Sequence, residues 1–486
     1  MANYQTMQIW VKKNHRMHGY FKEMCQHAKN MHNTTNFYIR QVFTAFTQEK
    51  AFQPLQEEVL DTIQKHMPII NANQFVVYQK KVVKEHSKPA RERKEIKCHL
   101  FKEPSRENPY VDYNFLDALF KSMAQEDYRS LPTQSSQGVM KTVFQNWKAF
   151  YGSLREYKTN PSKFKARPKI PGYRRKKEKE VLFSNQDCVI KENKFLKFPK
   201  TKERLNIGKL GFTEGRLKQV RLIPKYGHYM VELIFQMPSE QEMKASKKRY
   251  MSVDLGMDNL ATIVTNTGRK PVIVKGKNIK SINQRYNQLK AHYHGILRQG
   301  KNTNEGLFTS KRLEKINYKR FNQIKDLFHK ASYRIEKIAL EEDIDTIIIG
   351  QNKAWKQHAK MGKRNNQSFT TIPHRLLMQM IKYKAQRHGI KVIVTEETGR
   401  VSRMSMRRHL PQNLPYNQYL SMLFSWIIPH FLNVMKLVMI INECYFISPS
   451  TCFSQSSSTP QAISGSPFND FIVPTYTLFV DLPISI

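Results

Sequence analysis

Cysteine is scarce in this sequence, and its distribution argues against two common kinds of small domain. The five cysteines, Cys25, Cys98, Cys188, Cys444 and Cys452, lie far apart, and no two of them form a CxxC pair. A disulfide framework needs an even set of cysteines at short spacings, and a zinc ribbon needs CxxC pairs. We therefore expect neither, and zinc is not an expected cofactor of this chain.

Uninterrupted apolar runs are also lacking. The first fifteen residues, MANYQTMQIWVKKNH, contain no apolar core of the kind that a secretory signal requires. The stretch 419–441 is broken by Pro429, His430, Asn433 and Lys436, which makes it only a weak candidate for a membrane span. We expect a cytoplasmic protein with no membrane partner.

Acidic residues are few relative to basic ones. The 486 residues include 39 Asp and Glu against 81 Lys and Arg, a formal net charge of +42. Such an excess is typical of proteins that bind nucleic acid, because the phosphate backbone neutralises it. A solvated basic surface, or a ribosomal or membrane-surface protein, is the alternative. The length predicts two or three domains.

The first third of the chain is dominated by helical patterns. After one strand within residues 1–16, apolar residues recur at helical spacing in two parts of 17–160, separated by a basic, irregular stretch at 81–108 that predicts a loop. The first stripe includes Phe21, Met24, Cys25, Ala28 and Met31, and the second includes Val139, Val143, Trp147 and Phe150. We expect a helical domain over 17–160.

A Pro-rich basic segment follows, with the sequence NPSKFKARPKIPGYRRKKEKE at 160–180. Its prolines favour an extended backbone, and its rings are interleaved with cations, a combination that suits phosphates and bases of one strand. A solvated linker is the alternative. The candidate nucleic-acid-binding residues here are Lys163, Lys165, Arg167, Lys169, Tyr173 and Arg174.

Two β-containing regions come next. Residues 181–247 read as short strands separated by turn residues, which predicts an all-β module built as a small barrel. From 248, three strands are followed by helices at about 277–298 and 308–342, a fourth strand DTIIIG, a helix at about 373–388 and a fifth strand KVIVTE. This order is typical of an RNase H-like fold, in which the first, fourth and fifth strands are parallel and end at the same edge.

Carboxylates lie at the ends of two of these strands. Asp254 follows the first strand, and Glu396 and Glu397 end the fifth. Clustered carboxylates of this kind hold the Mg²⁺ ions of two-metal phosphodiester hydrolysis. The fourth strand ends at Gly350 instead of an acid. Glu396 or Glu397, one strand over, could reach the same metal because neighbouring strands are about 4.8 Å apart, and the sequence leaves open which of the two does so. Asp258 is expected to be a turn residue.

At these residues the chain resembles the TnpB (OrfB) family of transposon-encoded, RNA-guided nucleases. The matching stretches within residues 1–401 include KFKARPKIPGYRRK, VDLGMDNLATIVTN, IIIGQNKAWKQ and the segment that ends in TEE. The resemblance is to the branch in which the fourth strand ends in IGxNKxWKQ and the glutamate comes from the fifth strand.

The resemblance implies a set of roles and partners. Asp254, Glu396 and Glu397 would be catalytic, with Asp254 and Glu397 as metal ligands. A second nucleic-acid-binding group would comprise Lys353, Trp355, Lys356 and Gln357; core packing of Trp355 and a solvated face for the lysines are the alternatives. The partners implied are a guide RNA from the transposon end and target double-stranded DNA. The implied architecture is a β-barrel wedge-like module (1–16 and 161–247), a helical recognition domain (17–160) and a RuvC-type RNase H-like domain (248–401).

The sequence departs from the family pattern after the TEE motif. No Cys-rich zinc ribbon and no NADxNGA-like segment with a third aspartate is present, and residues 413–486 hold one lysine, no arginine and three acidic residues. We interpret 402–486 as an atypical tail, disordered or out of frame. We therefore expect an RNA-guided DNA endonuclease with impaired activity, or alternatively a catalytically inactive RNA-guided DNA-binding protein. A strand-transferring transposase is disfavoured because nothing resembles HUH or DDE chemistry.

Overall fold

The computed structural model has a mixed α/β architecture, as the sequence predicted. It describes residues 4–208, 215–237, 247–302, 305–351, 356, 362–395 and 477–478. The chain divides into two compact units. Unit 1 comprises 1–240, 301–318 and 475–486, and unit 2 comprises 241–300 and 319–474.

Unit 1 contains two sheets. In the larger sheet, β1 from the N-terminus pairs antiparallel with β7, which brings residues more than 200 positions apart into one sheet. The hairpin between β6 and β7 turns at Tyr226 and Gly227, both with positive φ, as a two-residue turn between right-twisted strands requires. The order is β13-β1-β7-β6-β2, with strands Thr477–Leu478, Tyr4–Val11, His228–Gln236, Arg216–Lys225 and Val181–Ser184; the smaller sheet is β3 (Val189–Lys191), β4 (Phe195–Lys197) and β5 (Arg204–Asn206).

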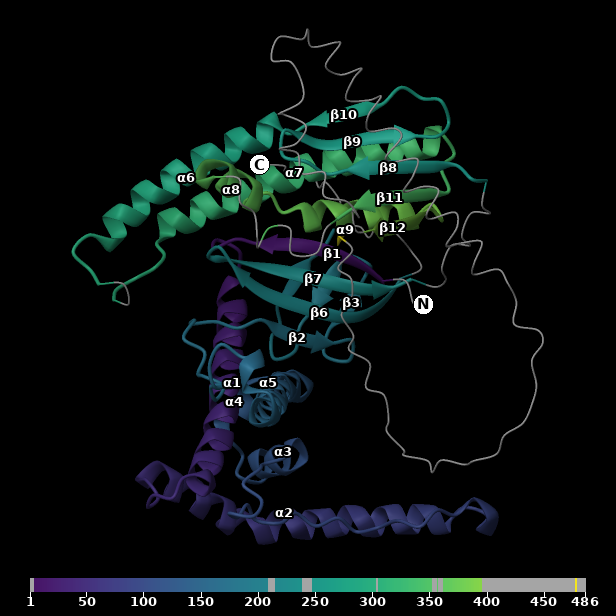
Figure 1. Ribbon diagram of the computed structural model, residues 1–486. Helices are drawn as coiled ribbons and strands as arrows, with labels where there is room; N and C mark the ends of the chain where they lie inside the picture. Colours follow the sequence, from purple (N-terminus) through teal and green to yellow (C-terminus); the bar gives the residue numbers. More distant parts are fainter. Residues whose placement is uncertain are drawn as a thin grey trace, which may run out of the picture. The chain divides into compact units, whose positions relative to one another are not determined.

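Figure 1 shows the helices of unit 1, and the buried residues of the first and the last of them follow the expected periodicity. Trp147 on α5 is fully buried and packs edge-on against Phe43 of α1, with 5.5 Å between ring centroids. One prediction was wrong: the stretch predicted as a loop from residue 81 is helical as far as His86, because Lys, Gln and Glu, which make up most of 79–85, are good helix formers. The helices are α1 (His18–Thr47), α2 (Pro54–His86), α3 (Tyr113–Ser122), α4 (Glu126–Ser130) and α5 (Thr133–Thr159), with 3-10 turns at Ala90–Glu92 and Pro161–Lys163.

Unit 2 contains a five-stranded mixed sheet in the order β10-β9-β8-β11-β12. β8 is antiparallel to β9, and β11 is parallel to both β8 and β12, as the sequence analysis expected. The strands are β8 (Tyr250–Asp254), β9 (Asn259–Thr265), β10 (Val272–Lys275), β11 (Thr346–Gly350) and β12 (Lys391–Thr395).

Helices occupy the segments between the last three strands of this sheet in the sequence. Helix α7 has a buried apolar stripe that includes Ile324, Phe328 and Ile335. Helix α9 ends before Gly389, whose φ of 67° suits glycine. The sequence analysis missed α8, whose polar sequence KRNNQSFT shows no clear apolar stripe. The helices are α6 (Lys277–Arg298), α7 (Lys311–Glu341), α8 (Lys363–Thr370) and α9 (His374–Gln386).

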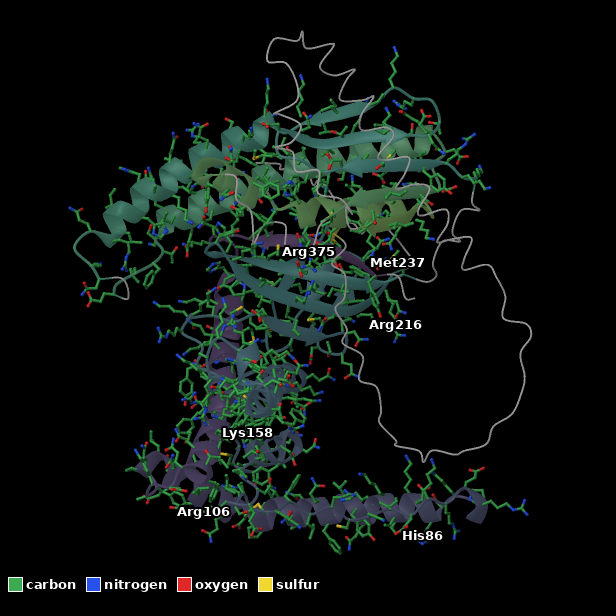
Figure 2. All side chains as sticks on the ribbon, viewed as in Figure 1. His86, Arg106, Lys158, Arg216, Met237 and Arg375 are labelled. Carbon is green, nitrogen blue, oxygen red and sulfur yellow. The ribbon has the colours of Figure 1, made fainter. Side chains whose placement is uncertain are left out.

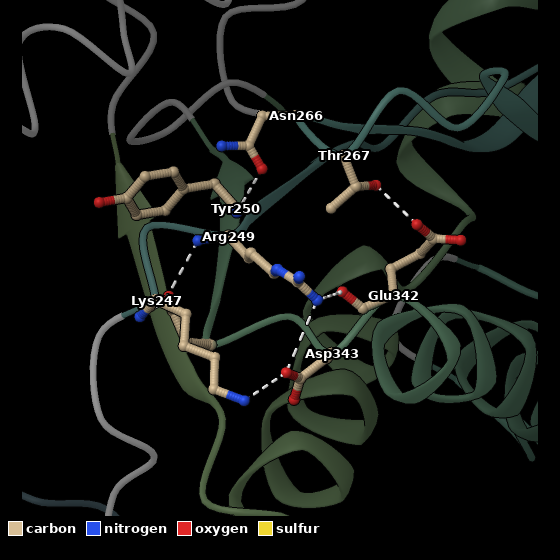
Figure 3. A network of polar contacts seen from close by, with 8 residues as sticks. Lys247, Arg249, Tyr250, Asn266, Thr267, Glu342 and Asp343 are labelled. Carbon is tan, nitrogen blue, oxygen red and sulfur yellow. Dashed lines mark hydrogen bonds and ion pairs between the residues drawn. The ribbon is translucent and has the colours of Figure 1, made fainter.

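A polar network holds the start of β8 to the end of α7 (Figure 3). The side chain of Asp343 pairs with Lys247 at 2.5 Å and with Arg249 at 3.6 Å. Thr267 donates to the carboxylate of Glu342 at 2.7 Å, and this bond and the one from Arg269 lower the pKa of Glu342. Because the network lies at the N-terminal end of β8, it supports the strand and leaves the opposite end, with Asp254, to the candidate site.

Among the residues that the structure describes, no helix combines the length and apolar character that a membrane span requires. The weak candidate at 419–441 lies outside those residues, as does nearly all of the tail predicted at 402–486.

Candidate functional site

The C-terminal ends of three parallel strands meet at one edge of the unit 2 sheet. Ile349 of β11 pairs with Val253 of β8 and with Val394 of β12. Asp254 is the next residue on β8, and Gly350 pairs with Thr395 one position further along β11 and β12. The half-buried Asp254 therefore stands level with the ends of both neighbouring strands, where functional groups collect in parallel sheets.

A buried histidine ties the turn after Asp254 to helix α9. The Nε2 of His374, the first residue of α9, donates to the backbone carbonyl of Gly256 at 3.1 Å. His374 is 1% exposed, and its ring packs near Phe369 with 5.7 Å between centroids. Sequence reasoning missed this contact; the Pro-His pair at the start of a helix was the available signal. The contact holds in place the backbone two residues beyond the candidate carboxylate.

Of the other acids singled out in the sequence, the structure describes Asp258 but not Glu396 and Glu397. Glu396 and Glu397 directly follow Thr395, the last residue of β12, and lie outside the described residues. Asp258 is a turn residue, as expected: its carboxylate pairs with Lys280 and its backbone carbonyl accepts from Gly276 at 2.7 Å. Within the described ranges, no group of three or more His, Cys, Asp or Glu side chains could hold a metal ion.

Lys356 is engaged by the protein itself. Its ammonium donates to the carbonyl of Ile372 and lies 5.7 Å from the centre of the Phe369 ring. Desolvation lowers the pKa of Lys356, which is half-buried. These contacts tie the chain after β11 to the end of α8. The other three residues of this group, Lys353, Trp355 and Gln357, lie outside the described residues.

In unit 1, the Pro-rich basic segment is fixed along helix α1. Asn33 bonds to both backbone groups of Arg174: its Oδ1 accepts from the amide at 2.8 Å and its Nδ2 donates to the carbonyl at 3.2 Å. The carbonyl of Pro171 accepts from Arg40 at 2.8 Å and from Asn36 at 3.2 Å. The extended backbone is therefore held by side chains and needs no strand partner of its own.

The cations of this segment remain at the surface. Lys163, Lys165, Arg167 and Lys169 are exposed. Lys163 forms an ion pair with Glu156 at 2.9 Å, and both side chains are exposed. Because water screens an exposed pair, a phosphate could take the place of the Glu156 carboxylate.

The end of the segment presents a ring and a partly covered cation. Tyr173 is 44% exposed, and the guanidinium of Arg40 lies 5.2 Å from its ring centre, which orients the ring. Arg174 is half-buried, and its guanidinium bonds to Glu180 at 3.4 Å. The segment therefore carries exposed cations and an exposed ring on a backbone that side chains of α1 hold.

Sequence reasoning missed the polar residues of α1 that support this segment. The indole of the buried Trp147 donates to Asn36 Oδ1 at 2.8 Å, which orients the amide toward Pro171. His32 lies close by: burial and the charges of Lys179 and Arg174 lower its pKa to about 4, against an opposing effect of Glu180. Asn33, Asn36 and Arg40 recur at spacings of three and four, so they lie on one side of α1, and this spacing was the available signal.

Comparisons with known proteins give one family match and several distant structural ones. Residues 232–356 match the OrfB_IS605 family model, described as "Probable transposase". No curated protein sequence matches.

Two of the solved structures that match are complexes. The first, a "Cas12f1-sgRNA-target DNA complex", has a TM-score of 0.36 and 10% identity, with 86% of this chain and 96% of that chain covered. The second, a "CRISPR-Cas12f Ternary Complex", has a TM-score of 0.25 and 10% identity, with 72% and 73% covered.

Proposed function

We propose, from the premise that residues 232–356 belong to the OrfB family of probable transposases, that this chain is a transposon-associated, RNA-guided DNA endonuclease of the TnpB type. The observation that carries the proposal is the position of Asp254. Asp254 lies at the edge of the sheet where β8, β11 and β12 end together. The residues that match the family model include β8 and β11, so the match and the position of Asp254 concern the same part of the chain.

The sheet order supports a RuvC-type RNase H-like domain over 248–401. The first three strands, β8, β9 and β10, pair antiparallel in chain order. β11 then pairs parallel with β8, and β12 pairs parallel with β11, which gives the order β10-β9-β8-β11-β12. In unit 1, the pairing of β1 with β7 supports one wedge-like β-module built from 1–16 and 161–247, with 17–160 as the helical recognition domain.

Mg²⁺ is the proposed cofactor. Carboxylate oxygens are the ligands that this ion prefers, so Asp254 fits it chemically. We propose Asp254 and Glu397 as the metal ligands and Glu396 as the third member of the catalytic set. Divalent ions at such a site activate a water and stabilise the leaving oxygen of a phosphodiester. The strand edge holds Asp254 in position, and the His374 contact fixes the turn that follows it.

The basic segment is the proposed contact to the nucleic acids, which are a guide RNA from the transposon end and target double-stranded DNA. Lys163, Lys165, Arg167 and Lys169 would neutralise phosphates, and Tyr173 would stack on a base. These contacts are independent of base sequence, so specificity would come from pairing between guide and target. Among the IGxNKxWKQ residues, Lys356 would act by holding its loop, given its bond to Ile372.

The activity is proposed to be impaired, because the sequence has no zinc ribbon and no third aspartate in a family-like context. That same departure favours a second candidate, a catalytically inactive RNA-guided DNA-binding protein. The two candidates share the RNA and DNA partners and differ only in the cleavage step.

One experiment separates them. The purified chain, loaded with RNA transcribed from its transposon end, is assayed for target binding and for cleavage with and without Mg²⁺. RNA-dependent binding with slow Mg²⁺-dependent cleavage that Asp254→Ala abolishes supports the endonuclease. Binding with no cleavage supports the second candidate. Absence of RNA-dependent binding overturns both.

A further inference from the structure

Strand β1 has only one long neighbour in the larger sheet of unit 1. It pairs antiparallel with β7 over eight consecutive residues, beginning with Tyr4 opposite Gln236. Arg216 and Met237 mark the end of the sheet at which β1 begins (Figure 2). Because the backbone groups of alternate residues point away from β7, the other side of β1 offers N–H and C=O groups to a further strand.

This outer edge of β1 is not protected by its sequence. The eight residues read YQTMQIWV and include no charged residue, no proline and no bulge. Edge strands are commonly short, charged or covered, because an open row of backbone groups can pair with other chains. The opposite edge of the sheet is protected in this way: β2 has four residues, and the carbonyl of Leu182 accepts from the hydroxyl of Ser135 at 2.7 Å.

A strand from the far end of the chain lies on the outer edge of β1. Thr477 and Leu478 of β13 pair parallel with Thr6 and Met7 of β1. Thr6 and Met7 are 0% and 5% exposed, and successive residues of a strand face opposite sides of the sheet, so β1 is covered on both faces here. The pairing joins the two ends of the chain in one sheet.

The sequence around β13 is typical of a strand. Residues 475–482 read TYTLFVDL, in which β-branched and aromatic residues predominate. Pro474 and Pro483 bracket this segment, and a proline has no N–H for a ladder hydrogen bond. The segment therefore has the same length as β1, eight residues.

We propose that the outer edge of β1 is a docking site for an extended segment, and that residues 475–482 of the same chain occupy it as a parallel strand. The register of β13, continued in both directions, brings Thr475 opposite Tyr4 and Leu482 opposite Val11, so the bracketed segment matches β1 from end to end. The docked strand covers an edge that would otherwise pair with other chains. This inference does not depend on the proposed nuclease activity.

The length of the chain favours docking within one molecule. The 81 residues between β12 and β13 span roughly 270 Å when extended, so they impose no limit on reach. A flexible tether of this kind corresponds to an effective concentration of about 1 mM. At micromolar protein concentration, the segment of the same chain therefore docks in preference to the segment of another copy.

Cysteine trapping tests the register. Neighbouring strands are about 4.8 Å apart, within the Cα separation that a disulfide spans. In the full chain, Thr6→Cys with Thr477→Cys should form a disulfide within one molecule on mild oxidation. Thr6→Cys with Ser457→Cys is the matched control, because Ser457 precedes the bracketed segment in the same tail. Peptide mass spectrometry identifies the linked residues. Equal yields for the two pairs, or a disulfide between two molecules, would overturn the proposal.

Hydrogen exchange tests the covering of the edge. Thr477→Pro with Leu478→Pro removes both amides of β13, one of which faces β1 because the amides of successive residues point to opposite sides. In this variant of the full chain, the β1 amides that do not face β7 should exchange about tenfold faster. Ser456→Pro with Ser457→Pro makes the same change elsewhere in the tail and should leave their exchange unchanged. Unchanged exchange in the first variant would contradict docking.

Rescue by a peptide separates lost docking from a general effect of the prolines. A synthetic peptide of residues 473–484, VPTYTLFVDLPI, added at about 1 mM to match the tether, should restore slow exchange of β1 in the Thr477→Pro, Leu478→Pro chain. The same peptide with both prolines introduced should not. A peptide that fails to restore slow exchange, or two peptides with equal effects, would also overturn the proposal. Far-ultraviolet circular dichroism verifies that every variant is folded.

Discussion

The imidazole of His374 donates to the carbonyl of Gly256 across 118 residues of sequence, two positions beyond Asp254. Both partners are held: His374 begins α9, and the Gly256 amide bonds to the carbonyl of Leu260 at 3.3 Å. The turn that follows the candidate carboxylate is thereby attached to a helix from the far end of unit 2. This contact is a positioning device, and it can be tested apart from the chemistry.

His374→Phe keeps an aromatic ring, somewhat larger than imidazole, and removes the donor. We expect a loss of about 1–3 kcal/mol in the free energy of unfolding, because a buried carbonyl is left without its hydrogen bond. Cleavage should fall while guide RNA binding is retained, since the basic segment is untouched. Urea denaturation and a cleavage assay measure the two effects. Unchanged stability would show that the contact does not hold the turn.

Asn33→Ala should weaken nucleic-acid binding without changing net charge. The substitution removes both hydrogen bonds to the Arg174 backbone, each worth about 1 kcal/mol, and frees one end of the extended segment. Asn30→Ala is the matched control, because Asn30 is an exposed asparagine on the same helix. Equal RNA affinities for the two variants, measured by fluorescence anisotropy, would contradict a supporting role for Asn33.

Neutralising the exposed cations should change the salt dependence of binding. For each of Lys165, Arg167 and Lys169 replaced by glutamine, the slope of log affinity against log salt should decrease by about 0.7–0.9, the value for one lost phosphate contact. Lys50→Gln, at an exposed site outside the segment, should leave the slope unchanged. A constant slope in the triple variant would mean that these cations face water in the complex.

His32 should make the fold sensitive to acid. Its pKa is about 4 in the folded chain and near 6.5 when unfolded, so between these values the unfolded chain binds the extra proton. Stability therefore falls as the pH is lowered through this window, by about 2 kcal/mol at pH 5 from this residue. Urea denaturation at pH 7.5 and pH 5 should show a smaller loss for His32→Gln than for the unmodified chain. An identical loss would assign the acid sensitivity to other groups.

Local patterns predicted much of the fold. The apolar spacing within α1, α5 and α7 was sufficient because a helix buries one face whatever it packs against. The strands of unit 2 were recognisable as short apolar runs, and their order along the chain predicted Asp254 at a shared edge of the sheet. The end of α2 and the whole of α8 were misjudged, because their sequences are too polar for periodicity to separate helix from loop.

The sequence alone therefore determined the periodic elements, the strand order, the strong basic charge and the chemistry of the candidate carboxylates. Only the tertiary structure decided which distant groups support them: His374 on the turn after Asp254, Asn33 and Arg40 on the basic segment, and Ile372 on Lys356. The physical reason is that apolar periodicity is a property of neighbouring residues along one helix or strand. A hydrogen bond between residues far apart in the chain exists only once burial of the apolar faces has brought their elements together.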